Sequence, residues 1–235
     1  MSQEFTVFMD YLNKLEKRYS FMLSAFYTWE ALIELCAPNI VGKKEARQNV
    51  EIMNRSNKFF GPSKESLRVY FLLELAKLFD ASDQSLHIDR VINFTESNIQ
   101  KLLVSDFAEF NQNRGFIEEL VKNYKGINIK DLKHVRSLIA LHTATIQDLK
   151  TYRDKYLAHD DISKVDVTLK QYKIKALFKV IEEILNLFSY KGNHSTRMYN
   201  SIEKECKNDT KMVLEYLRRF EPYRLKEINI KHGLE

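Results

Sequence analysis

The chain has 235 residues, of which 44% are hydrophobic and 29% charged, and its formal net charge is +5. This composition is typical of a folded globular protein and excludes a disordered chain. The small positive charge permits contact with a polyanion without requiring it. The longest apolar runs are only a few residues, far short of a membrane span, and the N-terminus lacks the apolar block of a signal peptide. We therefore expect a cytoplasmic protein with no membrane contact.

The fold class predicted from the sequence is all-α. Glycine and proline, which punctuate sheets and turns, number only 6 and 3, and no six-residue segment alternates convincingly between apolar and polar residues. The two cysteines, Cys36 and Cys206, stand alone and form no disulfide framework. Without a repeat or a flexible linker, one helical domain over residues 1–220 with a tail over 221–235 is the simplest organisation.

Apolar residues at spacings of three and four predict the helices of the first half of the chain. A long helix is expected over Ser2–Ala37, stopped by Pro38, and a more polar one over Lys43–Phe59. Gly61 and Pro62 predict a break and a new helix start. The most hydrophobic helix follows, with apolar positions from Leu67 to Phe79.

In the second half, Ser85 is the expected cap of a helix that carries Leu86 and Val91. The remaining helices are expected over Asn98–Asp106, Phe107–Tyr124, Ile129 into the stretch Thr151–Asp161, Val167–Tyr190 and Tyr199–Phe220. A turn over Lys125–Asn128 separates two of them.

Several kinds of site are unsupported. The sequence has no glycine-rich phosphate loop, no HExxH motif, no EF-hand pattern and no GxSxG elbow. None of the six histidines pairs with another three or four residues away, so no single helix presents a two-histidine metal face. We expect neither a bound metal nor another cofactor.

The stretch TYRDKYLAHDD, Thr151 to Asp161, is the strongest functional signal. At about 100° per residue, the six steps from Arg153 to His159 leave the two about 120° apart around a straight helix. They would converge only if the helix ends or bends near Ala158, or if a symmetric dimer supplies a second copy. The alternative is structural, because cations are common near helix C-termini.

Chemically, the two side chains suit cleavage of a phosphodiester by its own 2′-hydroxyl. Histidine can accept and return a proton near neutral pH, and arginine can hold the charge that develops on the phosphate. Asp154 could orient Arg153 or a neighbouring backbone donor. No metal is needed for this reaction.

Arg153, the polar Asp154 after it and His159, with five residues between the arginine and the histidine, resemble the signature of the HEPN superfamily (higher eukaryotes and prokaryotes nucleotide-binding domain), in which four to six residues intervene. RDKYLAHDD is similar to HEPN-like proteins of the abortive-infection U type, and YFLLELAKLFDASDQSLHI, Tyr70 to Ile88, resembles an earlier helix of the same proteins. The resemblance covers about Met1 to Tyr190. It implies a HEPN-type bundle with peripheral helices, catalytic roles for Arg153 and His159 supported by Asp154, and a dimer that brings two motifs into one cleft.

The interpretation that follows is a metal-independent endoribonuclease that acts in phage defence or as a toxin, with RNA, a second copy and an antitoxin or defence protein as partners. Lys155, Lys170 and Lys173 could guide the RNA backbone, and Tyr152 and Tyr156 could stack bases. The same residues could instead be solvated lysines and packed tyrosines. The position two residues after the histidine holds Asp161, where some HEPN toxins carry a tyrosine that is modified. The alternative function is a non-catalytic HEPN-like module that binds RNA, a nucleotide or a protein; a helical scaffold without any nucleic-acid role is a third.

Overall fold

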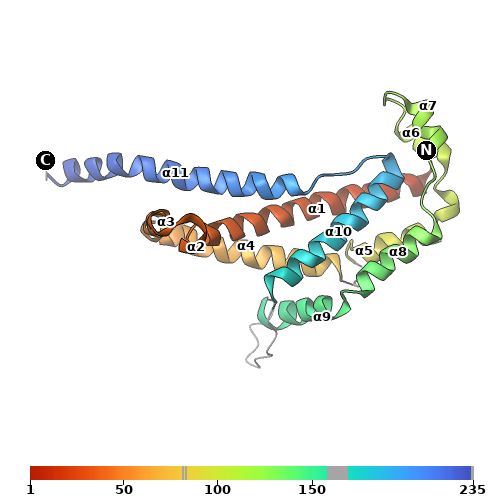
Figure 1. Ribbon diagram of the computed structural model, residues 1–235. Helices are drawn as coiled ribbons and strands as arrows, with labels where there is room; N and C mark the ends of the chain where they lie inside the picture. The colour runs from red at the N-terminus through yellow and green to blue at the C-terminus, as the bar shows by residue number, and fades with distance from the viewer. Residues whose placement is uncertain (81, 83, 158–168, 234–235) are drawn as a thin grey trace. The chain divides into compact units, whose positions relative to one another are not determined.

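A computed structural model describes residues 1–80, 82, 84–157 and 169–233, and these residues form helices joined by turns and loops, with no β-strand among them (Figure 1). The all-α fold class is therefore confirmed. Within this described part, no helix is at once long and apolar enough to cross a membrane.

The contacts between Cα atoms group the chain into two compact units. Unit 1 comprises Met1–Ser20 and Leu72–Tyr199, and unit 2 comprises Phe21–Phe71 and Asn200–Glu235. Two long helices, α1 (Gln3–Glu34) and α4 (Asn57–Leu78), contribute residues to both units.

Unit 1 is built around the N-terminal part of α1. Its other elements are α5 (Ile88–Ser97), a 3₁₀ turn (Ile99–Lys101), α6 (Val104–Phe110), α7 (Ile117–Asn123), α8 (Ile129–Ala140), α9 (Thr143–Tyr152), a π-helical turn (Arg153–Leu157) and α10 (Gln171–Asn193). α8 packs against both α5 and α10 (Figure 1). The core consists of side chains that recur at helical spacing, among them Phe8, Leu12, Leu75, Val91, Val135, Ile181 and Phe188.

Polar contacts fix α1 against α10 inside this core. The hydroxyl of Tyr19 lies 3.0 Å from the carbonyl oxygen of Phe178 and 3.0 Å from a carboxylate oxygen of Glu182. Near the other end of α10, Gly192 lets the two helices approach closely, because an added Cβ would lie 2.9 Å from the sulfur of Met9 and 3.0 Å from a ring carbon of Phe8.

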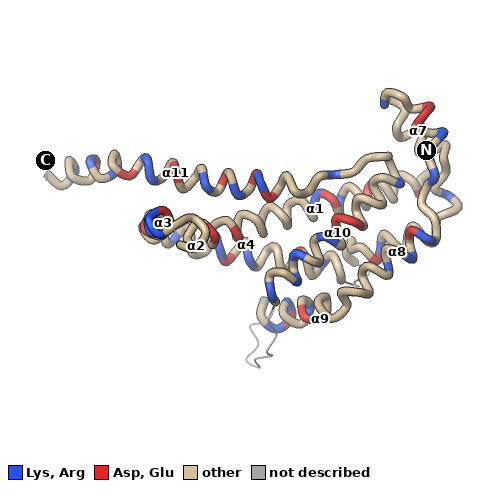
Figure 2. Tube along the Cα trace, viewed as in Figure 1, with Lys and Arg blue, Asp and Glu red and all other residues tan. Residues whose placement is uncertain are grey.

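Unit 2 consists of the rest of α1 and α4 together with α2 (Pro38–Val41), α3 (Lys43–Arg55) and α11 (Asn200–Lys231). Its core includes Leu32, Leu35, Ile52, Met53, Phe60 and Leu214. Lys207 on α11 lies 3.0 Å from the buried carboxylate of Glu30 and 3.1 Å from Glu34. Basic and acidic residues alternate along α11 (Figure 2), which is typical of a solvated helix surface.

Two predicted helix boundaries in the first half of the chain are wrong. Gly61 and Pro62 lie inside α4, which begins at Asn57. Pro62 is exposed, so a carbonyl that loses its helical partner there can be hydrated. The cap of α5 is His87 rather than Ser85: its Nδ1 accepts a hydrogen bond from the backbone N–H of Arg90 at 3.2 Å.

Other boundaries differ farther along the chain. The helix expected over Phe107–Tyr124 is split, because α6 ends at Phe110 and the following Asn-Gln-Asn-Arg-Gly stretch favours turns. The long helix expected from Ile129 is broken between Ala140 and Thr143, and the Thr143 hydroxyl donates to the Ala140 carbonyl at 2.9 Å. Such hydrogen bonds from a side chain to the backbone compete with the backbone hydrogen bonds of a helix. The last helix, expected to end at Phe220, continues to Lys231.

Candidate functional site

Arg153 lies where α9 changes its winding. α9 ends at Tyr152, and Arg153–Leu157 form a π-helical turn. A π-helical turn contains more residues than an α-helical turn, and such segments often occur at functional sites. The angular relation calculated for a straight α-helix therefore does not apply beyond Arg153.

Two carboxylates hold the Arg153 guanidinium from different parts of unit 1. Nε donates to Asp154 at 2.7 Å, and Nη1 donates to Asp80 at 3.0 Å. The hydrogen bond with Asp154, reinforced by the charge of Asp80, raises the pKa of the Arg153 guanidinium. The side chain is only 20% exposed. Nε and Nη1 are therefore both directed at carboxylates of unit 1, and these two bonds fix the orientation of the guanidinium.

Asp80 is the member of this site that sequence reasoning did not name. It follows the end of α4, 73 positions before Arg153, and its backbone N–H bonds to the Lys77 carbonyl. It is the last residue of the Leu-Phe-Asp phrase in the stretch that resembles HEPN-like proteins. That phrase was the one signal in the sequence that could have linked Asp80 to the Arg153 motif.

The predicted catalytic partner, His159, lies outside the described residues, as does Asp161. Of the predicted pair, the structure therefore shows the position of Arg153, together with the carboxylates of Asp154 and Asp80 that bind it. The meeting of Arg153 with His159 stays a prediction.

The two predicted stacking residues lie together. The rings of Tyr152 and Tyr156 have centroids 5.0 Å apart and are inclined by 34°. Tyr156 is exposed and Tyr152 half-buried. The pair therefore presents one partly accessible aromatic surface directly beside Arg153 in the sequence.

The basic residues predicted to bind RNA differ in their exposure and in their contacts. Lys170 is exposed at the N-terminal cap of α10, and Lys155 is half-buried. Lys173 lies 3.4 Å from the carboxylate of Asp148 on α9. Because Asp80, Asp148 and Asp154 each pair with a cation, this region is one of compensated charge rather than a bare basic patch.

The described part of the chain contains no group of three or more His, Cys, Asp or Glu side chains that could hold a metal ion. What the arrangement offers chemically is a fixed, permanently charged guanidinium with an aromatic surface in the neighbouring positions. Such groups bind phosphate and bases.

Comparison with known proteins identifies the family of the chain. Residues 7–213 match the model of the HEPN family AbiU2. No curated protein and no solved structure matches the chain. Since the family match spans most of the 235 residues, the chain belongs to the AbiU2 family of HEPN domains, a family related to abortive infection.

Proposed function

We propose that this AbiU2 family member is a metal-independent endoribonuclease that acts in abortive infection, with Arg153 and His159 at its reacting centre. The observation that carries the proposal is the double carboxylate support of Arg153, which presets a guanidinium edge for a phosphate. Preorganised charge of this kind stabilises a transition state without reorganisation during the reaction.

In the proposed reaction, the 2′-oxygen of one nucleotide attacks the adjacent phosphorus. The O2′–P bond forms and the P–O5′ bond breaks. His159 accepts the proton of the 2′-hydroxyl and a protonated imidazole supplies one to the leaving O5′. Arg153 holds the negative charge on the phosphate oxygens, and Asp154 and Asp80 keep it in place.

A homodimer fits this proposal, since an isologous contact would bring two copies of the motif together. The partly exposed pair Tyr152 and Tyr156 supports the binding of unpaired bases, and Lys155 and Lys170 remain candidates for the RNA backbone. A defence partner or antitoxin would act by covering this region.

The test compares a single-stranded RNA with a DNA of the same sequence, both 5′-labelled, in the presence of EDTA. We expect cleavage of the RNA alone, with a 2′,3′-cyclic phosphate on one product and a 5′-hydroxyl on the other. Cleavage of both substrates, or loss of RNA cleavage in EDTA, would contradict the mechanism.

A second candidate function is a non-catalytic module that binds RNA or a nucleotide through the same surface. The aromatic pair Tyr152 and Tyr156 favours it, because stacking of bases on such a surface needs no reacting centre. Saturable RNA binding that weakens steeply with salt, without any cleavage by the pure protein, would select this alternative.

A further inference from the structure

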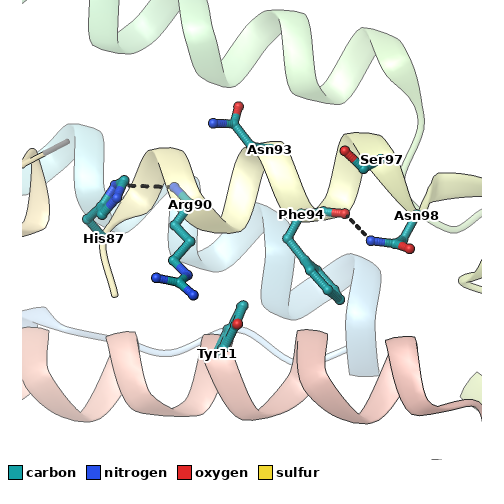
Figure 3. A pocket seen from close by; sticks show the side chains of 7 residues that line it. All are labelled: Tyr11, His87, Arg90, Asn93, Phe94, Ser97 and Asn98. Carbon is teal, nitrogen blue, oxygen red and sulfur yellow. Dashed lines mark hydrogen bonds between the residues drawn. The ribbon is translucent and has the colours of Figure 1, made fainter. Parts of the chain in front are cut away.

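Two hollows of the molecule differ in their chemistry. The hollow beside α5 in unit 1 is polar, and its side chains already bind one another or the backbone: His87 caps α5, and the Asn98 amide donates to the Phe94 carbonyl (Figure 3). A hollow of about 330 Å³ in unit 2 is mainly apolar and is lined by α1, α4 and α11. The apolar residues that define this unit 2 hollow are Leu32, Phe59, Phe60, Leu67, Val213 and Leu214.

An exposed stripe of apolar and aromatic side chains leads from the unit 2 hollow along α11. Val213, which lines the hollow, is followed at spacings of three and four by Tyr216, Phe220 and Tyr223. These four residues, the α11 stripe, have exposed fractions of 52%, 60%, 53% and 67%. The rings of Phe220 and Tyr223 stack, with centroids 6.4 Å apart and planes inclined by 29°. Exposed apolar surface of this extent marks an interaction site.

The α11 stripe lies on a different face of the helix from the residues that hold α11 in unit 2. Leu214 belongs to the core of unit 2, and Glu221 pairs with Arg55 on α3. Leu214 and Glu221 are seven positions apart, so they mark one line along the helix. At about 100° per residue, this line is about 100° away from the line of Val213 and Phe220. The stripe is therefore not used by the packing of α11 within unit 2.

The form of the surface fits a helix. From Val213 to Tyr223, α11 rises by about 15 Å, at about 1.5 Å per residue. Spacings of three and four are those by which one helix packs along another, with the side chains at positions a and d of a seven-residue repeat in the seam. When an amphipathic helix binds a groove, its apolar side chains at the same spacings enter pockets of the groove. The unit 2 hollow provides such a pocket at one end of the stripe.

The charges beside the α11 stripe indicate which helix fits. With Val213 and Phe220 at position a of the repeat, the flanking positions e and g carry basic side chains and no acidic one. The next stripe positions in the two directions are Asp209 and Glu227, which end the apolar surface. The flanking residues are Leu217, Arg219, Arg224 and Lys226.

These flanks disfavour a second copy of the chain. In a parallel pair of helices position g faces position e of the partner, and in an antiparallel pair like positions face each other, so basic side chains would oppose basic side chains in both cases. Arg219 and Lys226 are exposed, and Arg224 pairs with Glu221 on its own helix. A partner helix with acidic flanks meets attraction where a second copy meets repulsion.

We propose that the unit 2 hollow and the α11 stripe bind an amphipathic helix of another protein that has large apolar residues at positions a and d and acidic residues on its flanks. One apolar side chain of that helix enters the hollow, and the following ones lie on Tyr216, Phe220 and Tyr223. Its carboxylates face Arg219 and Lys226. This function goes beyond RNA cleavage and does not rest on it. Of the stripe, only Val213 belongs to the residues that the family model matches.

The test uses two synthetic helical peptides, each three heptads long, with leucine at positions a and d and alanine at b, c and f. They differ only at e and g, which are glutamate in the acidic peptide and lysine in the basic peptide. The uniform charge of each peptide opposes pairing with its own copy. Fluorescence anisotropy measures the binding of each labelled peptide to the full chain at neutral pH.

Tyr216→Ser and Phe220→Ser each remove one exposed ring of the stripe. Leu225→Ser is the matched control, because Leu225 is 46% exposed on the same helix and lies about 180° from Tyr216 around its axis. We expect the acidic peptide to bind saturably, with Kd raised tenfold or more by each stripe variant and changed less than twofold by the control. Thermal unfolding checks the fold, and either stripe variant is sufficient if the other does not fold.

A charge reversal tests the complementarity of the flanks. The double variant Arg219→Glu with Lys226→Glu should weaken binding of the acidic peptide and strengthen binding of the basic peptide, each at least tenfold. Three results would overturn the proposal: no saturable binding of the acidic peptide, equal affinity of the parent for the two peptides, or parental affinity in the folded stripe variants.

Other occupants of the surface give distinct results. A parent mass in sedimentation velocity that falls in Tyr216→Ser would identify a second copy. Flotation with vesicles of phosphatidylglycerol and phosphatidylcholine that is lost in Tyr216→Ser would identify a lipid surface. Either result would overturn the proposal of a partner helix. None of these measurements involves RNA cleavage, so failure of the ribonuclease proposal leaves them unaffected.

Discussion

At the scale of single residues, Arg153 owes its position to one neighbour in sequence and one far from it. Asp154 follows it directly, whereas Asp80 reaches it from the end of α4. The adjacent residue could be suggested from the sequence as an orienting group. Asp80 could not be suggested in this way, because its contact with Arg153 depends on how the chain folds between residues 80 and 153. No local sequence pattern predicts that folding.

Asp80 should act as a positioning residue for Arg153. Asp80→Asn weakens the charge that holds Nη1, and small displacements of a catalytic group can cost up to about 100-fold in rate. We expect kcat for RNA cleavage to fall about 10- to 100-fold with a smaller change in KM. Asp148→Asn is the control, because Asp148 pairs with Lys173 instead. Equal kcat values in Asp80→Asn and the parent would refute the role.

Glu16 is a buried carboxyl whose titration affects stability. Burial raises its pKa, although Arg197 lies 2.8 Å away and opposes the shift. A raised pKa means that the folded state holds the proton more tightly, so this stabilisation is fully present below the unfolded pKa of about 4.3 and is lost as pH rises through the folded pKa.

Urea unfolding between pH 4 and pH 7 should reveal this effect as a difference between the free energies of unfolding of Glu16→Gln and of the parent. The stability of Glu16→Gln relative to the parent should increase as pH rises through this window. Glu74→Gln should show the opposite trend at lower pH, below the unfolded pKa of about 4.3. Burial opposes ionisation of Glu74, but hydrogen bonds with Lys77 and Arg18 outweigh it and lower the pKa. Parallel pH profiles for Glu16→Gln and the parent would show that Glu16 has no shifted pKa.

At the scale of elements, periodicity predicted the existence of most helices better than their ends. The first helix was expected over Ser2–Ala37 and spans Gln3–Glu34, because its apolar stripe is long and Pro38 follows it. The break after Ala140 has no glycine or proline to announce it. The π-helical turn at Arg153 likewise has no sequence signal, since it depends on the packing around it.

Gly192 tests the packing of α10 against α1. Gly192→Ala should reduce the free energy of unfolding by about 1–3 kcal/mol, the usual cost of overpacking, because its methyl group would press on Met9 and Phe8. Gly115→Ala is the matched control, since no atom lies within 4 Å of its added Cβ. Urea unfolding measures both. Equal effects of the two substitutions would contradict the close approach of the helices.

At the scale of the whole molecule, the all-α class and the family followed from composition, periodicity and two short phrases of sequence. The proposed reacting centre did not follow as completely, because helical periodicity predicts neither the placement of His159 nor a contact between two chains. A proposed shared site makes a specific prediction about mixed subunits.

Co-refolded mixtures of Arg153→Ala and His159→Ala chains should recover RNA cleavage if each centre takes Arg153 from one chain and His159 from its partner. One centre of every mixed dimer would then be intact. The comparison is between the mixture and each variant alone, at equal total protein. No recovery, together with mixed dimers detected by mass spectrometry, would place both residues of a centre on the same chain.

The most direct test of the central claim is the single-turnover rate of RNA cleavage by Arg153→Ala and by His159→Ala, with Arg47→Ala as the control for a lost surface arginine. We expect a loss of at least about 1,000-fold in both site variants, in keeping with the removal of a charge-stabilising or proton-transferring group, and a parental rate in the control. Folded site variants that cleave RNA as fast as the parent would contradict it.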